Sequence, residues 1–372
     1  RSAWGAFRSV ALPLARPAIV AGTALALMET LADFGTVAHF GIPTFATGIY
    51  RTWSSMGDRI AAAQLSSILL VFVVLLVWVE RMSRKQARYH HTSKRYQEIT
   101  GLQLNGWRAV TAFMFCALPM VVGFLAPLAM LLWMHMSDGH DLFSPRYLEM
   151  ITNSVMLAGI TAILAVVLSL FLVYVANYQR SWLAQFANKV VGLGYAVPGS
   201  MIAVGILIPL AAFDNAINTL MQETFNISMG LIFTGSLAAL VLGYLVRFMA
   251  VSMNTIQASL AKVTPNMENV SRTLGNGPFN TAMKVHVPII SGGLMTAGLI
   301  VFVDVMKELP ATLIMRPFNF DTLAVQAYNL ASDERLAQAA TPSLVIVAVG
   351  ILPLILMSRA IMRSRPGSQK NS

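Results

Sequence analysis

Four carboxylates stand in two pairs at the ends of apolar stretches of the sequence. Glu29 and Asp33 form one pair and Asp304 and Glu308 form the other, each with a spacing of four residues. Residues four apart lie on one face of a helix, so each pair predicts a column of negative charge. Because ionisable groups in or beside apolar helices are costly, they usually serve a function. The two columns are therefore candidates for a site that attracts a cation.

Lys307 adds a positive charge beside Glu308 and leaves the role of this group open. One hypothesis is that Lys307 forms an ion pair that gates a path past the carboxylates. The alternative is that the carboxylates only meet water at the end of a helix, or form pairs there with Lys307 and Arg316.

The composition indicates that most of the chain lies in lipid. Of 372 residues, 56% are hydrophobic and 11% are charged, whereas a soluble domain has roughly 25% charged residues. A net charge of +10 would favour nucleic acid as the partner of a soluble protein. In a membrane protein it directs attention to where the basic residues lie, and no nucleic-acid partner is expected.

Helices of about 20 apolar residues are long enough to cross a bilayer. The sequence predicts eight of them, and hence an all-α polytopic membrane protein. Their predicted ranges are 17–34, 61–79, 109–134, 153–174, 190–212, 230–246, 289–305 and 342–357. The two pairs of carboxylates then stand at the ends of the first and seventh helices.

The basic residues are distributed unevenly between the two ends of these helices. Twenty of the 26 Lys and Arg residues, but only three of the 16 acidic ones, fall in segments on one side. These segments are 1–16, 80–108, 178–189, 247–288 and 358–372. Because basic segments are typical of the cytoplasmic side, both ends of the chain are expected to be cytoplasmic and the carboxylates to lie at the extracytoplasmic end.

Residues near the start of the chain match residues 275 positions later. The matched pairs include Trp4 with Phe279, Pro13 with Pro288, Glu29 with Asp304, Asp33 with Glu308, Thr47 with Thr322 and Asp58 with Asp333. Both copies start on the same side, which predicts a parallel repeat related by an axis along the membrane normal.

The repeat also predicts the domains. The second copy follows four predicted spans and the first follows none, so we expect the first unit to be truncated at its N-terminus. The domains expected are the end of a first unit (1–80), a basic cytoplasmic linker (81–108), a second unit (109–358) and a cytoplasmic tail (359–372).

Each copy has a short polar loop before its first apolar helix. In the second copy the sequence ENVSRTLG predicts a short helix that ends at Gly275, since glycine adopts the left-handed conformation that closes a helix. A second short helix is predicted from Phe279 to Val287, with Pro288 closing it and opening the next span. Two such loops predict a cytoplasmic partner with two-fold symmetry.

This loop resembles the EAA loop of ABC importer permeases, which reads Glu-Ala-Ala, three residues, Gly, nine residues, Ile, one residue, Leu-Pro. Here Gly275, the nine-residue spacing and Pro288 match, and Glu268 lies one place upstream of the usual glutamate. In that family the loop docks on an ATPase subunit. The resemblance implies a coupling role for Trp4, Pro13, Glu268, Gly275, Phe279 and Pro288. Trp4 and Phe279 are then candidate aromatic anchors, unless they pack only within their own loops.

Residues 29–53, 195–210 and 305–340 look like fused two-unit ferric-iron permeases. The resemblance implies import of Fe³⁺ across the cytoplasmic (inner) membrane, with ATP and Mg²⁺ on a separate, dimeric ATPase and an extracytoplasmic substrate-binding protein as partner. Fe³⁺ is a hard cation that prefers oxygen ligands, which suits the carboxylates. Permeases for thiamine, polyamines or another small solute remain the alternative.

The motifs absent from the sequence argue against an enzyme. It contains no Gly-x-x-x-x-Gly-Lys-Ser/Thr phosphate loop, no His-Glu-x-x-His and no Gly-x-Ser-x-Gly. We therefore expect no catalytic site, bound cofactor or firm metal site in this chain. An ion-driven secondary transporter also uses repeats and intramembrane carboxylates, but it has no need for paired docking loops.

The sequence VPGS at 197–200 interrupts an apolar run. Pro198 removes a helix hydrogen bond and Gly199 allows another helix to approach closely. A kinked span at this point is a candidate gate, and a kink that serves only packing is the alternative.

Overall fold

The computed structural model describes residues 3–85, 103–139, 141, 143–179, 182–261 and 263–364. Regular structure in these residues is helical throughout. Seven helices are long and apolar enough to cross a membrane, and the bent pair Trp4–Arg16 and Ala18–Ala32 makes an eighth. The all-α polytopic fold predicted from the sequence is confirmed.

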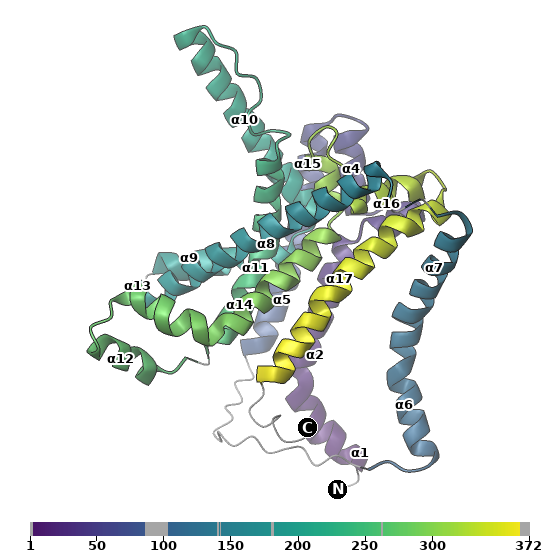
Figure 1. Ribbon diagram of the computed structural model, residues 1–372, viewed down its shortest axis with the longest axis vertical. Helices are drawn as coiled ribbons and strands as arrows, with labels where there is room; N and C mark the ends of the chain where they lie inside the picture. Colours follow the sequence, from purple (N-terminus) through teal and green to yellow (C-terminus); the bar gives the residue numbers. More distant parts are fainter. Residues whose placement is uncertain are drawn as a thin grey trace.

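The first unit is a pair of long helices joined by two short ones. In chain order it contains α1 (Ala3–Ala6), a π turn η1 (Phe7–Ala11), α2 (Leu12–Ala32), α3 (Gly35–His39), α4 (Phe45–Ser54) and α5 (Arg59–Lys85). Helices α2 and α4 both pack on α5. The short helices lie at the end opposite the N-terminus (Figure 1).

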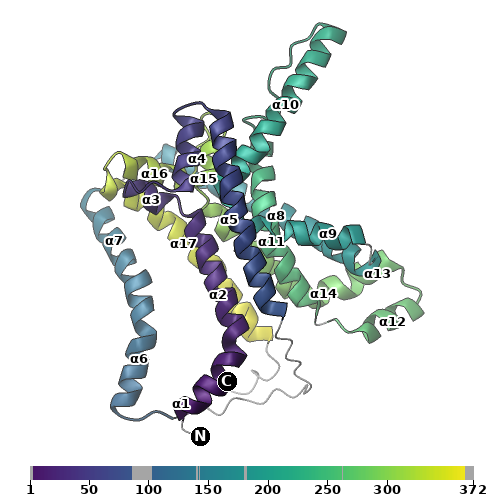
Figure 2. The same cartoon turned by 180° about the vertical axis from the view of Figure 1, so that it is seen from behind.

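The second unit is built around α8, α11 and α14, which pack against one another. It contains α6 (Trp107–Met120), η2 (Val121–Leu125), α7 (Ala126–Asp138), α8 (Pro145–Gln179), α9 (Trp182–Val191), η3 (Gly194–Ala196), α10 (Gly199–Phe225), α11 (Leu237–Leu260), α12 (Pro265–Thr273), α13 (Pro278–Thr281), η4 (Ala282–His286), α14 (Val287–Met306), α15 (Pro310–Met315), α16 (Leu323–Ser332) and α17 (Leu336–Ser364). Helices α6 and α7 stand apart from the bundle and meet it at α17, and the end of α10 projects from it (Figure 2).

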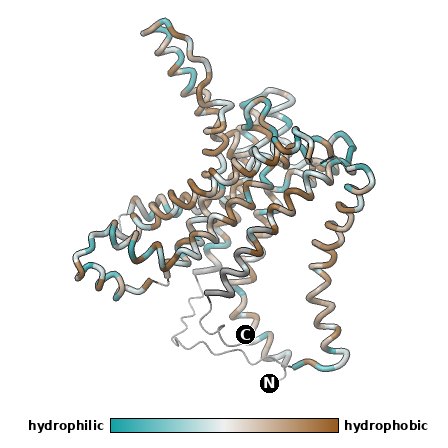
Figure 3. Tube along the Cα trace, viewed as in Figure 1, coloured by the Kyte–Doolittle hydropathy of each residue, from teal (hydrophilic) through white to brown (hydrophobic). Residues whose placement is uncertain are grey.

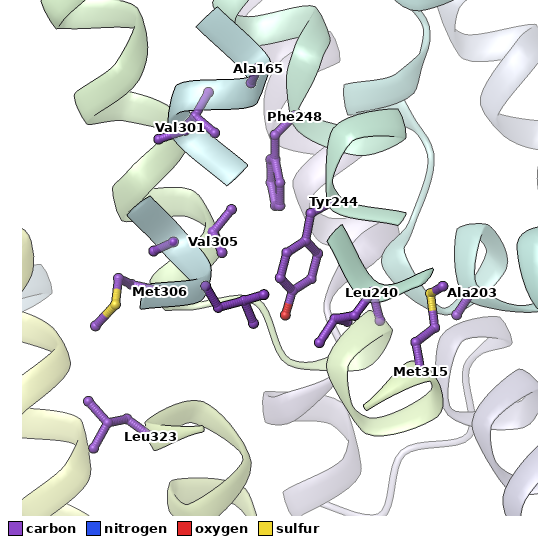
Figure 4. Close-up of a cluster of buried hydrophobic side chains, with 14 of the residues drawn as sticks. Ala165, Ala203, Leu240, Tyr244, Phe248, Val301, Val305, Met306, Met315 and Leu323 are labelled. Carbon is purple, nitrogen blue, oxygen red and sulfur yellow. The ribbon is translucent and has the colours of Figure 1, made fainter. Parts of the chain in front are cut away.

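Apolar residues cover the outer surfaces of the long helices, α6 and α7 above all, whereas polar residues gather in the loop that carries α12 and α13 (Figure 3). The buried core surrounds Tyr244, whose ring lies near Leu240, Val305 and Phe248 (Figure 4). The Tyr244 hydroxyl forms a 2.5 Å hydrogen bond with the hydroxyl of Thr312. This bond ties α15 to α11.

A π turn precedes a proline at three places in the described part of the chain. In η1 the N–H of Leu12 donates to the carbonyl of Phe7, and Pro13 follows. In η4 the N–H of Val287 donates to Ala282 in the same way before Pro288, and η2 precedes Pro127. Proline lacks an N–H and its ring clashes with the preceding turn of an α-helix, so a wider turn gives it room.

The π turn at Pro288 corrects one prediction. Pro288 does not close a short helix, because the helix runs without a break through Pro278–Met306. The turns η1 and η4 also lie 275 positions apart, the same offset as the sequence repeat. The two copies therefore share a backbone irregularity as well as residues.

Predicted span 190–212 is wrong at its start. Helix α9 ends at Val191 and α10 begins only at Gly199. Between them the chain makes the single turn η3, and Pro198 has an extended backbone with ψ 144°. A side chain at Gly194 would overlap the carbonyl of Val246, so this turn packs directly on the backbone of α11.

Predicted span 230–246 is displaced toward the N-terminus. Helix α11 begins at Leu237, because the Ser236 hydroxyl accepts the N–H of Ala239 and caps it. The preceding loop is held by Asp214, which is fully buried and accepts the N–H groups of Phe233 and Thr234. Apolar residues in this loop made it resemble the start of a span.

The repeat continues in the structure with a changed register. Helices α4 and α16 have ten residues each and follow Thr44 and Thr322, whose hydroxyls cap them. Thr44, rather than the predicted Thr47, is thus the counterpart of Thr322. Thr47 instead completes a capping box with Thr44. The reason is that α15 has six residues where α3 has five, and the segment that follows α15 is also longer than the one that follows α3.

Two predicted domain boundaries fall inside helices. Helix α5 continues to Lys85, past the predicted start of the linker, and α17 continues to Ser364, past the predicted start of the tail. The rest of the linker up to residue 102 and of the tail from residue 365 lies outside the described residues.

Candidate functional site

The carboxylates singled out in the sequence line one cavity of about 330 Å³. It lies where α2 and α14 end, and its lining includes Glu29, Asp33, Asp304, Lys307 and Glu308. We call this cavity the acidic pocket. The first unit supplies two of its carboxylates and the second unit supplies the other two, so the pocket belongs to the interface of the two units.

Glu308 is buried and forms an ion pair with Arg247. The Arg247 Nη1 atom lies 2.8 Å from Glu308 Oε1, and the two side chains are 10% and 5% exposed. The same Oε1 accepts the N–H of Ala311 at the start of α15. A charge inside an apolar bundle is retained when it is paired and hydrogen-bonded in this way.

Arg247 is a site residue that the sequence prediction missed. It was placed at the start of the cytoplasmic segment 247–288, but it lies within α11 and is buried. The signal was present in the sequence, because the apolar run continues after it as Phe248-Met249-Ala250-Val251. An arginine in the middle of such a run predicts a carboxylate partner. Without Arg247, 19 of the 26 Lys and Arg residues, rather than 20, fall in the segments expected on the cytoplasmic side.

Gly199 makes room for this ion pair. A Cβ atom at this position would overlap both Glu308 Oε1 and Arg247 Nη1. Pro198 lies just before it at the N-cap of α10. The predicted kink within a span is therefore wrong, since the two residues stand where a helix starts and where it meets the ion pair.

The remaining charges leave the acidic pocket with a negative excess. Lys307 Nζ lies 3.2 Å from Asp304 Oδ1. Within the described part of the chain Glu29 and Asp33 form no ion pair, and Asp33 accepts the N–H of Thr36 at the start of α3. Four carboxylates and two cations thus leave two unbalanced negative charges.

Arg316 does not take part in the pocket, because it pairs with Asp321. Across the described residues, no three or more His, Cys, Asp and Glu side chains are grouped so that they could hold a metal ion. The acidic pocket is therefore a region of negative potential and not a preformed set of metal ligands.

The residues of the predicted coupling loops lie at the other end of the bundle, where α1 and the α12–α13 loop face away from α4, α15 and α16 (Figures 1 and 2). Trp4 and Phe279 are 72% and 70% exposed. Trp4 stacks on Phe7 within its own segment, whereas Phe279 extends from the first turn of α13.

The α12–α13 loop is held rigidly. Gly275 follows α12 with a φ of 81°, a conformation that suits glycine. The hydroxyls of Ser271 and Thr281 are 2.9 Å apart and join α12 to α13. The Tyr174 hydroxyl donates to the carbonyl of Pro278 and joins the loop to α8. Glu268 pairs with Arg272 on the surface of α12.

No family model matches the sequence. The chain is 26% identical over 352 residues to the Fe(3+)-transport system permease protein FbpB 2 of Haemophilus influenzae, covering 93% of this chain and 66% of that protein. It is 24% identical over 184 residues to a 2-aminoethylphosphonate transport system permease protein of Salmonella typhimurium, covering 50% of this chain and 62% of the relative. The chain thus spans less than two thirds of the length of these relatives.

Two solved structures share the fold. One is a bacterial ABC transporter involved in the import of alginate, with a TM-score of 0.54 and 12% identity, covering 70% of this chain and 96% of the other. The second is an alginate ABC transporter in complex with a periplasmic protein bound to an alginate pentasaccharide, with a TM-score of 0.52, 13% identity and coverage of 71% and 96%.

The chain is homologous to permease proteins of transport systems and shares its fold with solved structures of ABC transporters. The predicted resemblance to this class and to its ferric-iron members is thereby confirmed. The relatives are permease proteins of transport systems, and the long apolar helices agree with a multi-pass membrane protein.

Proposed function

We propose that this chain is the transmembrane permease subunit of an ABC importer that moves ferric iron across the cytoplasmic membrane. ATP with Mg²⁺ is hydrolysed by a separate dimeric ATPase, and an extracytoplasmic binding protein delivers the substrate. The acidic pocket carries the proposal, because it places two unbalanced negative charges between the two units of a permease fold. The homology to an Fe(3+) permease over 93% of the chain supports iron as the cargo.

The acidic pocket attracts cations through its excess of negative charge. Glu29 and Asp33 are the carboxylates without an ionic partner among the described residues, so they supply the excess negative charge. A charged cleft with walls of low dielectric constant concentrates ions of the opposite sign. A transport path must also release its ion, which favours a site that attracts Fe³⁺ over one that chelates it tightly.

A single helix connects the cytoplasmic loop with the pocket. The span Pro278–Met306 has 29 residues and is therefore about 43 Å long at 1.5 Å per residue. Phe279 lies at its first turn and Asp304 at its last. Docking of the rigid α12–α13 loop on a moving ATPase would shift Asp304 and the Lys307–Glu308 segment at the other end.

The other candidate substrates differ in charge, so the acidic pocket would attract some of them and repel others. A phosphonate is an anion, so four carboxylates oppose it even though Arg247 and Lys307 are near. Thiamine and polyamines are cations, and the charge of the pocket favours them as it favours iron. The paired docking loops and the ABC homologues favour ATP-driven transport over an ion-driven secondary transporter.

The test is uptake of radioactive iron by cells that carry the complete transporter. Replacing Glu29→Gln together with Asp33→Asn should lower the initial rate by about tenfold, the lower end of the effect of a charged cleft on ion capture. Glu308 is left unchanged because its replacement would leave the buried Arg247 without its ionic partner. The control is Glu223→Gln, a carboxylate on the exposed end of α10, which should not change the rate.

The outcome that contradicts the proposal is full iron uptake by the double variant at wild-type expression. Competition identifies the cargo in the same assay, by adding excess thiamine, spermidine or 2-aminoethylphosphonate. Inhibition of uptake by one of these compounds would assign the transporter to that solute instead.

A further inference from the structure

A second cavity lies beside the acidic pocket, along the same two helices. Its volume is about 820 Å³. On α2 its lining ends at Met28, and the lining of the acidic pocket begins at Glu29. On α11 it includes Met253 and Gln257, whereas the acidic pocket includes Arg247. The two cavities therefore follow one another along both helices, and we call the second one the inner cavity.

The inner cavity combines apolar and polar lining and has a different charge from the acidic pocket. Its polar lining consists of Glu80, Arg81, Asn188, Lys189, Asn254 and Gln257. One carboxylate and two basic side chains give the inner cavity a net charge of one positive unit. The cavity includes the C-terminal end of α5 and faces the side of the bundle that holds the coupling loops. A cation that left the acidic pocket in this direction would not be held there.

Tyr195 is the residue that lines both cavities. It lies in η3, in the break between α9 and α10. Gly194 packs on the backbone of α11 on one side of it, and Ala196 packs with Val73 and Val77 of α5 on the other. The turn is thus clamped between a helix of the second unit and a helix of the first.

We propose that the Tyr195 side chain is the barrier between the acidic pocket and the inner cavity, and hence the gate of the path between the two units. This proposal rests on the proposed function for the direction of transport and adds the residue that controls it. A single 3-10 turn carries Tyr195, so its ring can move without the unwinding of a membrane-spanning helix. Its clamps on α5 and α11 make its position depend on the distance between the two units.

The experiment measures access to the inner cavity and needs neither iron nor ATP. A reporter cysteine is introduced as Asn254→Cys in a Cys116→Ala background of the complete transporter. A small, positively charged, membrane-impermeant methanethiosulfonate is added outside intact cells. Adding Tyr195→Ala should accelerate labelling of the reporter by about tenfold, which corresponds to a modest reduction of the barrier.

Two variants separate the gate from general loosening of the structure. Tyr195→Phe should label at the parent rate, because the ring and not the hydroxyl forms the barrier. Tyr50→Ala should also label at the parent rate, since Tyr50 lines neither cavity. If Tyr195→Ala fails to reach the membrane, Tyr195→Val gives the same comparison.

Equal labelling of Tyr195→Ala and its parent overturns the proposal, as does equal acceleration by Tyr50→Ala. Labelling from the cytoplasmic side after permeabilisation should be the same in all variants and shows that they are folded. Because the assay is independent of the cargo, a failure of iron uptake and a failure of the gate give different results.

Discussion

At the residue scale, the buried pair of Arg247 and Glu308 determines how the acidic pocket is built. The pair joins α11 to the segment after α14, and its atoms come within 2.8 Å. Removing one partner of a buried ion pair leaves an uncompensated charge, which costs about 3–5 kcal/mol. Gly199 belongs to the same structure, because its missing side chain provides the space for the two charged groups.

Replacing Gly199→Ala should therefore destabilise the protein. The added Cβ overlaps both charged groups, and overpacking of this kind costs about 1–3 kcal/mol. We expect a lower midpoint of thermal unfolding in detergent. Gly205→Ala is the matched control on the same helix, because nothing lies within 4 Å of its Cβ position. An unchanged midpoint for Gly199→Ala would show that the pair adjusts without cost.

At the element scale, the helix that begins in the α12–α13 loop continues through α14. The π turn η4 accommodates Pro288, so α13, η4 and α14 form one continuous helix that includes Phe279 and ends at Met306. The break between α9 and α10 has the opposite character, since a single turn separates two helices there. The helix that connects the α12–α13 loop with the acidic pocket is thus continuous, and the proposed gate lies at a break between two helices.

Phe279→Asp should uncouple transport from ATP hydrolysis. Because Phe279 is mostly exposed, the substitution should leave the fold intact while it places a charge where the ring would dock. We expect loss of uptake and weaker co-purification of the ATPase subunit. Phe143→Asp is the control, as a strongly exposed aromatic residue at the other end of the bundle. Normal uptake by Phe279→Asp would mean that Phe279 serves only its own loop.

At the scale of the whole molecule, the two units meet where α10 packs on α4 and α5, α15 on α4, α16 on α3 and η3 on α2. The ring of Phe34 at the end of the first unit packs against Tyr328 of the second. The repeat is imperfect, because the two copies pair their carboxylates differently. Asp304 and Glu308 have basic partners, whereas Glu29 and Asp33 have none among the described residues. This asymmetry gives the pocket its negative excess.

The proposed orientation predicts opposite accessibility for the two ends of the molecule. Leu274 in the coupling loop and Phe143 before α8 are both strongly exposed. In a Cys116→Ala background, Phe143→Cys should react with an impermeant thiol reagent on intact cells. Leu274→Cys should react only after permeabilisation. The reverse pattern would contradict the orientation inferred from the basic segments.

The sequence by itself determined the class of the fold, the repeat and the four carboxylates that line the acidic pocket. These features depend on composition and on residues that recur at a fixed offset. The predicted columns on helix faces are wrong, because α2 ends at Ala32 and α14 at Met306, before Asp33 and Glu308. The sequence also indicated the loop before α14, because Gly275 and the spacing to Pro288 belong to one short segment.

Only the tertiary structure decided what surrounds the carboxylates. Arg247 and Glu308 are 61 positions apart, and Gly199 and Tyr195 come from yet another segment, so no local pattern connects them. The starts of α10 and α11 were misplaced for a related reason. Apolar residues fill both the loops and the helices there, and hydropathy cannot distinguish a buried loop from a span. The contacts of Asp214 and the packing of η3 on α11 fix those loops, and both need groups that meet only in the folded bundle.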